Sequence, residues 1–264
     1  MNVINEVRNP QTLGAGERYD TLVITENHSV LAAIQWENTT GFLRHYHDLM
    51  ISGNPATRTF FYHSWLDINK SNPTQWIAHE KNAAFTWECV VSKVNQSIPA
   101  NRTDRLRLLP AGGALIDLVE RVVANQVPEI SGTTANKMNM LFVDNVHMTR
   151  LGNYYLALVV YSSIYGKSAV GTAPPSEVGI STSLARSLQT IAWNYVNSYY
   201  SQSENPAART MASCRNFIAN NTCSTYWALQ GSPGETNSCR NFYSTDSTDN
   251  PFRNAPLVPY APAW

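Results

Sequence analysis

A carboxylate and an imidazole stand three positions apart in this sequence, at Asp144 and His147, directly before a long apolar helical pattern. At that spacing the carboxylate can accept a hydrogen bond from one ring nitrogen, fix the tautomer and stabilise the protonated ring. The pair would then act as a general base with its orienting group. The helix expected to follow, ending near Gly166, would give rigid support, and Gly152 would keep a side chain from crowding the pocket. The alternative is a helix cap or a surface pair.

Short strand patterns alternate with helical patterns ahead of this pair. Strands are predicted at residues 19–25, 57–62 and 106–109, and helices at residues 31–35, 42–50, 79–95 and 114–125. This alternation predicts an α/β fold, a three-layer sandwich around a mainly parallel sheet, with sites at the carboxyl ends of its strands. Residues 126–141 are expected to form the loop leading to Asp144, and a further amphipathic helix is expected at 181–200.

Polar and aromatic residues follow the first two predicted strands. Asn27 and Ser29 come after the first strand, and His63 and Trp65 come after the second. Ser29 is a candidate nucleophile at a positive helix end, with a capping role as the alternative. His63 and Trp65 are candidates for substrate binding, with Trp65 as an aromatic wall for a sugar or aryl ester. Ordinary core packing of Trp65 is the other interpretation.

The order of a strand, then Asn27, and about 120 residues later Asp144-x-x-His147 before a helix resembles the SGNH or GDSL hydrolase family. The resemblance covers roughly residues 19–166. It implies a flavodoxin-like fold and a serine ester hydrolase that needs no cofactor or metal and acts on acetyl or other short acyl esters of carbohydrates. In that mechanism His147 takes the serine proton, Asp144 orients His147, and Asn27 donates to the oxyanion.

The sequence also departs from the family pattern. Thr25 stands where the family has glycine, and the Gly-Asp-Ser nucleophile block and the oxyanion glycine have no counterpart, since residues 1–26 contain no serine. The first strands are therefore expected to be missing. Because the family's first strand lies beside the strand at residues 22–24, an open apolar edge is expected, with a partner chain or segment covering it. Two alternatives follow: a non-catalytic relative that keeps the cleft for binding, and a fragment completed by another polypeptide.

Composition excludes several classes of function. The chain has 264 residues, a formal net charge of +0 and only 14% charged residues, so no basic surface for nucleic acid is expected. No apolar run approaches the roughly 20 residues that span a bilayer. The first residues lack the pattern of a signal peptide, so any export signal is expected to lie outside this sequence.

Cysteine positions suggest an oxidising compartment. Three of the four cysteines, Cys214, Cys223 and Cys239, lie in a polar stretch near the C-terminus, and two of them are expected to form a disulfide. Cys89 lies on an apolar helical face and is expected to be a buried, reduced thiol. We therefore expect a secreted or periplasmic protein with an α/β domain at residues 1–203 and an irregular, disulfide-pinned extension at 204–264.

Overall fold

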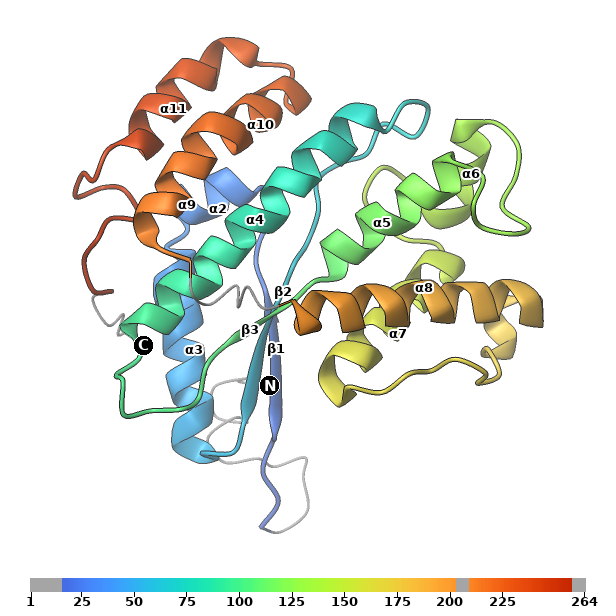
Figure 1. The fold of residues 1–264 in the computed structure, drawn as a ribbon, viewed down its shortest axis with the longest axis horizontal. Coiled ribbons are helices and arrows are strands. Elements are labelled where there is room, and N and C mark those ends of the chain that lie inside the picture. Colours follow the sequence, from blue (N-terminus) through green and yellow to red (C-terminus); the bar gives the residue numbers. More distant parts are fainter. Residues whose placement is uncertain (1–15, 203–208, 258–264) are drawn as a thin grey trace.

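The computed structural model describes residues 16–202 and 209–257, which form an α/β fold around a small parallel sheet (Figure 1). Strands β1 (Thr21–Thr25), β2 (Arg58–Tyr62) and β3 (Arg107–Leu109) lie in the order β1-β2-β3. All pairings are parallel, with Thr21 opposite Arg58 and Phe60 opposite Arg107. The predicted strands and their parallel arrangement are confirmed.

Helices cover both faces of the sheet because successive side chains of a strand point to opposite sides. Phe60 of β2 belongs to one buried cluster, and its neighbour Phe61 belongs to another. The cluster of Phe60 includes residues of α5 (Ala111–Val123), α6 (Thr134–Leu141), α7 (Arg150–Tyr165) and α8 (Thr182–Ser201). The cluster of Phe61 includes residues of α2 (Val30–Trp36), α3 (Thr39–Gly53) and α4 (Thr74–Ser97). A short 3-10 turn, η1 (Ser176–Val178), lies between α7 and α8.

Strand β1 is an edge strand among the described residues, since no other described strand pairs with it besides β2. None of its five residues is buried, and Val23 is 41% exposed, whereas β2 buries three of its five residues. The open edge expected from the sequence is therefore present in the described part of the chain. An exposed apolar edge favours pairing with a further strand.

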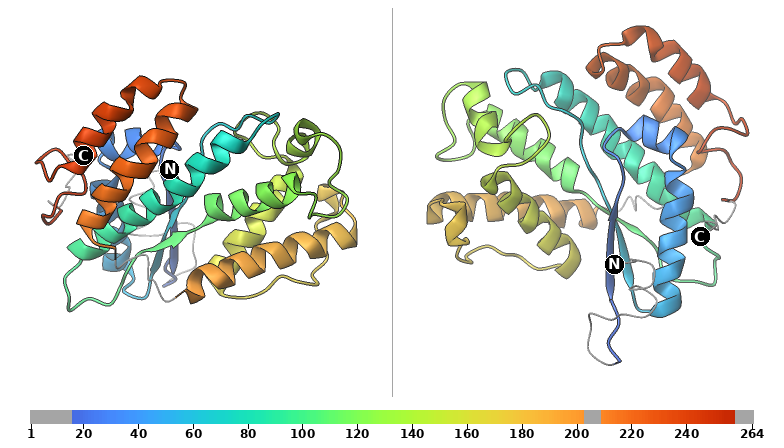
Figure 2. Two further views of the ribbon diagram at one scale, coloured as in Figure 1. Left: turned by 45° about the horizontal axis from the view of Figure 1, so that its top comes forward. Right: turned by 180° about the vertical axis from the view of Figure 1, so that it is seen from behind.

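The C-terminal stretch is helical, so the prediction of an irregular extension is wrong. It contains α9 (Met211–Phe217), the π-helical turn η3 (Ile218–Thr222), α10 (Cys223–Leu229), the 3-10 turn η4 (Pro233–Glu235) and α11 (Thr236–Ser244). These elements pack beside α4 (Figure 2), where Met211, Ile218 and Tyr226 bury enough apolar surface to stabilise helices. The boundary expected between 203 and 204 falls outside the described residues.

Two disulfides hold the C-terminal helices. Cys223 pairs with Cys239, which confirms a bridge between two of the three clustered cysteines. Cys89 pairs with Cys214, so the prediction of a reduced Cys89 is wrong. The reason is tertiary: α9 packs on α4 and brings Cys214 to the buried face that carries Cys89. This bridge spans 125 residues of sequence and therefore ties α9 to the main body.

A further correction concerns the stretch before Asp144. The loop predicted over 126–141 contains α6, which begins after Thr133, whose hydroxyl accepts the backbone N–H of Asn136. Met138 and Leu141 of this helix are buried in the cluster around α5 and α7. Within the described ranges, no helix combines the length and apolar character needed to cross a bilayer.

Candidate functional site

The loop carrying Asp144 and His147 is closed by backbone hydrogen bonds. Phe142 and Met148 form an antiparallel bridge, and the N–H of Val143 donates to the carbonyl of His147 at 2.8 Å. Five residues are thus held between two paired positions. A closed loop of this kind gives its side chains a defined direction without a regular element.

The start of α7 secures the same loop. The Thr149 hydroxyl accepts the N–H of Gly152 at 3.2 Å and caps the helix. A Cβ atom on Gly152 would lie 2.5 Å from the carbonyl oxygen of Leu141. Gly152 therefore permits close contact between α7 and the end of α6, which is a different role from the expected clearing of a pocket.

Asp144 and His147 form the predicted pair. The His147 ring nitrogen Nδ1 lies 2.7 Å from Asp144 Oδ2, and Asp144 Oδ1 accepts the backbone N–H groups of Val146 and His147, each at 2.7 Å. The N–H of His147, and next that of Val146, hold the pKa of the Asp144 carboxyl well below its usual range. An ionised carboxylate only accepts hydrogen bonds, so in the neutral ring Nδ1 carries the proton and Nε2 keeps a free lone pair. The side chains are 78% exposed for His147 and 56% exposed for Asp144.

The segment after β2 joins this loop to the turn after β1. The indole N–H of Trp65 donates to the carbonyl of Val146 at 3.0 Å, and the Ile68 N–H donates to the carbonyl of Asn145 at 2.8 Å. On the other side, the Ser64 hydroxyl donates to the carbonyl of Glu26 at 3.4 Å. The three segments therefore adjoin at the carboxyl end of the sheet, where parallel strands place their sites.

Asn27 and Ser29 lie in the turn between β1 and α2. Asn27 Oδ1 accepts the N–H of Ser29 at 3.0 Å, which leaves its amide NH2 without a partner among the described residues. The Ser29 hydroxyl shares a 2.6 Å hydrogen bond with the hydroxyl of Tyr226 on α10. In the described part of the chain no hydrogen bond joins Ser29 to His147, whose ring contacts only Asp144 in this way.

His63 and Trp65 are both buried, so neither side chain is open to a ligand as the substrate-binding prediction required. Trp65 belongs to the hydrophobic core, which favours the packing interpretation. The ring of His63 lies against α5, where a Cβ atom on Gly112 would come within 2.6 Å of it. The His63 N–H donates to the carbonyl of Leu109 at 3.1 Å, so the chain after β2 continues beside β3, where α5 lies against the His63 ring.

A buried polar cluster was missed by sequence reasoning. Glu80 Oε2 lies 4.0 Å from His63 Nε2, and among the described residues neither atom has a hydrogen-bond partner, nor has Nε2 of the nearby buried His79. Burial, with repulsion from His79 second, lowers the pKa of His63 to about 3, while burial raises the pKa of Glu80 to about 8. The sequence does contain one sign of this cluster: Glu80 lies on the same helical face as the apolar residues Trp76, Ala83 and Trp87, which predicts a buried carboxyl.

Comparison of the chain with family models, with curated proteins and with solved structures finds no match. Across residues 16–202 and 209–257, no group of three or more His, Cys, Asp or Glu side chains is arranged to hold a metal ion.

Proposed function

We propose that this chain is an SGNH-type ester hydrolase module that carries the base His147, its orienting carboxylate Asp144 and the oxyanion donor Asn27. The observation that supports it most is the 2.7 Å contact between His147 Nδ1 and Asp144 Oδ2, which leaves Nε2 with a free lone pair. His147 would take a proton from a nucleophilic hydroxyl and return it to the leaving alcohol. The free amide of Asn27 would donate to the oxyanion.

Neither of the two candidate serines, Ser29 and Ser64, has a free hydroxyl that could act as the nucleophile. The Ser29 hydroxyl is engaged by Tyr226, and Ser64 donates to the Glu26 carbonyl. We therefore propose that the nucleophilic serine belongs to a further strand that pairs with the open edge of β1, in this polypeptide or in a partner. The proposed substrates, by resemblance to the family, are short acyl esters of carbohydrates. Two disulfides suit an oxidising compartment, in keeping with a secreted or periplasmic enzyme.

The experiment is hydrolysis of p-nitrophenyl acetate by the purified chain, compared with His147→Ala and with His45→Ala as the matched control on α3. A general base contributes about 10²–10⁴-fold, so His147→Ala should remove at least about nine tenths of the rate above buffer. His45→Ala should leave that rate unchanged. A rate above buffer that survives His147→Ala would contradict the proposal, whereas no rate above buffer is the result expected if the nucleophile lies in a partner.

Labelling with a fluorophosphonate locates the nucleophile in the same preparation. We expect no labelled serine, because Ser29 and Ser64 are both engaged elsewhere. A label on either residue, lost together with activity in the corresponding serine-to-alanine variant, would show that this chain contains its own nucleophile.

A non-catalytic binding protein is the second candidate. The occupied hydroxyl of Ser29 favours it, since an activated serine needs a free hydroxyl within reach of its base. It predicts esterase rates that do not change in His147→Ala, and the hydrolysis experiment therefore separates the two functions.

A further inference from the structure

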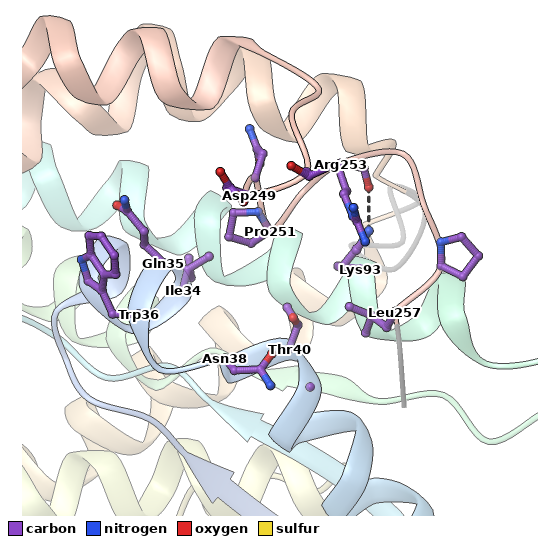
Figure 3. A pocket seen from close by; sticks show the side chains of 14 residues that line it. Ile34, Gln35, Trp36, Asn38, Thr40, Lys93, Asp249, Pro251, Arg253 and Leu257 are labelled. Atoms are coloured by element: carbon purple, nitrogen blue, oxygen red, sulfur yellow. Dashed lines mark hydrogen bonds between the residues drawn. The ribbon is translucent and has the colours of Figure 1, made fainter. Parts of the chain in front are cut away.

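A pocket of about 370 Å³ lies between the α2–α3 corner and the chain that follows α11. Figure 3 shows it as an elongated hollow with Trp36 at one end and Leu257 at the other. The pocket has no part in the mechanism proposed above, because none of the residues lining it belongs to the loop of His147 or to the turn at Asn27. Its volume is within the range of small-molecule sites.

Trp36 is the most exposed large apolar side chain in the described part of the chain, at 74%. It is the last residue of α2, and its indole N–H has no hydrogen-bond partner among the described residues. A side chain this exposed contributes little to the core and is open to a ligand. A rigid aromatic ring beside a pocket offers a flat apolar face and one N–H donor to a ligand.

Polar side chains without hydrogen-bond partners in the described ranges line the same pocket. Gln35, Asn38, Asp249 and Arg253 all contribute to its wall, and within the described ranges none of their side chains has a hydrogen-bond or ion-pair partner. Asn38 has a left-handed backbone with φ of 50°, and its amide oxygen would lie 2.6 Å from a Cβ atom on Gly41. The glycine thus makes room for this amide at the pocket.

Buried hydrogen bonds hold the wall made by residues after α11. The ammonium of Lys93, a buried residue of α4, donates to the carbonyls of Arg253 at 2.6 Å and Ala255 at 2.7 Å. The buried amide of Asn250 donates to three carbonyls, including that of Thr245 at 2.8 Å, and accepts the N–H of Phe252. Because these bonds already fix the wall, a ligand would not have to order it on binding.

The chemistry of these groups selects the ligand class. A purely apolar ligand would leave two amides, a carboxylate and a guanidinium without partners, which is costly on desolvation. An anion would be attracted by the guanidinium of Arg253 but repelled by the carboxylate of Asp249, and the charge of Lys93 is already directed at backbone carbonyls. Planar amide, carboxylate and guanidinium groups suit neighbouring hydroxyls, which both donate and accept. An aromatic face suits the C–H side of a sugar ring.

We propose that this pocket binds a neutral carbohydrate chain, with a sugar ring stacked on Trp36 and hydroxyls bonded to Gln35 and Asp249. The site does not depend on the proposed esterase function. It would hold a polysaccharide on the molecule whether or not the chain cleaves esters.

The test is isothermal titration of the purified chain with cellohexaose, xylohexaose and mannohexaose. We expect at least one probe to bind with a dissociation constant of about 1 mM or lower, which corresponds to about −4 kcal/mol. Trp36→Ala should weaken that binding at least about tenfold, or about 1.4 kcal/mol. Tyr165→Ala, which removes an exposed aromatic ring from the end of α7, should bind as the wild type does.

Several outcomes would overturn the inference. These are the absence of binding to all three probes, unchanged binding in Trp36→Ala, or stronger binding of an oligogalacturonate than of every neutral probe. Thermal unfolding of Trp36→Ala should match the wild type, because the ring is exposed. If Trp36→Ala unfolds, Asp249→Ala, at an exposed position after α11, provides the second variant and should weaken binding several-fold. His147→Ala should bind the probes normally, so failure of the esterase proposal would leave this result intact.

Discussion

Two histidine–carboxylate pairs lie near the carboxyl end of the sheet, and they differ in burial and in distance. His147 and Asp144 are 78% and 56% exposed and lie 2.7 Å apart on a surface loop. His63 and Glu80 are each only 1% exposed, and their closest nitrogen and oxygen atoms are 4.0 Å apart. The same two kinds of group therefore meet in very different environments.

Solvation explains why only the exposed pair carries a charge at neutral pH. Water and two backbone N–H groups stabilise the Asp144 carboxylate, whereas burial favours the neutral forms of both members of the inner pair. In the buried pair, His63 and Glu80, the carboxyl group has a structural role instead. Glu80 Oε1 accepts the N–H of Leu66 at 2.7 Å, and the carbonyl of Leu66 accepts the indole N–H of Trp76 at 2.7 Å.

The segment that Glu80 holds also contacts the loop of the exposed pair. Leu66 lies between Trp65 and Ile68, whose N–H groups donate to the carbonyls of Val146 and Asn145 in the loop of His147. The buried carboxyl thus fixes the segment against which the exposed pair rests. Each of the following predictions tests this division between a buried anchor and an exposed base.

The largest expected effect is on stability, from Glu80→Ala. The change leaves the buried N–H of Leu66 without an acceptor and opens a cavity, which together should lower the free energy of unfolding by about 3 kcal/mol. Urea unfolding followed by tryptophan fluorescence measures it. Asp144→Ala is the matched change in the exposed pair and should leave the urea midpoint nearly unchanged. A larger loss from Asp144→Ala than from Glu80→Ala would reverse the comparison.

A smaller effect is expected on the pH dependence of stability. The pKa of Glu80 rises from 4.5 to about 8 on folding, so between these values the folded state binds more protons and stability falls as pH rises. The pKa of His63 falls from 6.5 to about 3 and that of His79 falls from 6.5 to about 4, both by burial, so their contribution to stability rises with pH up to 6.5. Above 6.5 the Glu80 effect dominates, and near pH 8 it is opposed by Lys93, whose pKa burial lowers from 10.5 to about 8.

Stability should therefore fall by about 1 kcal/mol between about pH 6.5 and pH 8, because Glu80 gives the full slope of about 1.4 kcal/mol per unit only well below pH 8 and Lys93 opposes it near pH 8. Glu80→Gln keeps an oxygen acceptor for Leu66 and cannot ionise, so this alkaline decline should disappear in urea titrations at several pH values. Glu120→Gln, at an exposed glutamate paired with Lys81, should keep the decline. An unchanged decline in Glu80→Gln would mean that another group causes it.

The exposed pair could be predicted from sequence because its geometry is local. An Asp and a His three residues apart on a closed loop meet whatever the rest of the fold does. The inner pair could not be predicted in this way, since His63 follows β2 while Glu80 lies on α4, and only the packing of α4 on the sheet brings them close. The same holds for Cys89 and Cys214, which are separated by 125 residues.

The strands and long helices were also predictable, because their apolar periodicity is strong. The helices after residue 210 were not, since their polar composition hides the few side chains, such as Met211 and Ile218, that pack on α4. Short helices depend on tertiary contacts more than on propensity. The role of Ser29 likewise depended on a partner, Tyr226, that lies 197 positions away.

The smallest expected effect is on the tautomer of His147. In alkaline solution, where the ring is neutral, the Asp144 carboxylate can only accept, so the Nδ1–H form should predominate. In Asp144→Asn the amide can present either an oxygen or an NH2 group to the ring, so the ratio of Nδ1–H to Nε2–H forms should fall several-fold. Ring ¹⁵N chemical shifts measure this ratio, and the exposed His28 is an internal control whose ratio should not change. An unchanged ratio for His147 would show that Asp144 only stabilises the loop by accepting the N–H groups of Val146 and His147. The exposed pair would then differ from the buried pair in solvation but not in catalytic capacity.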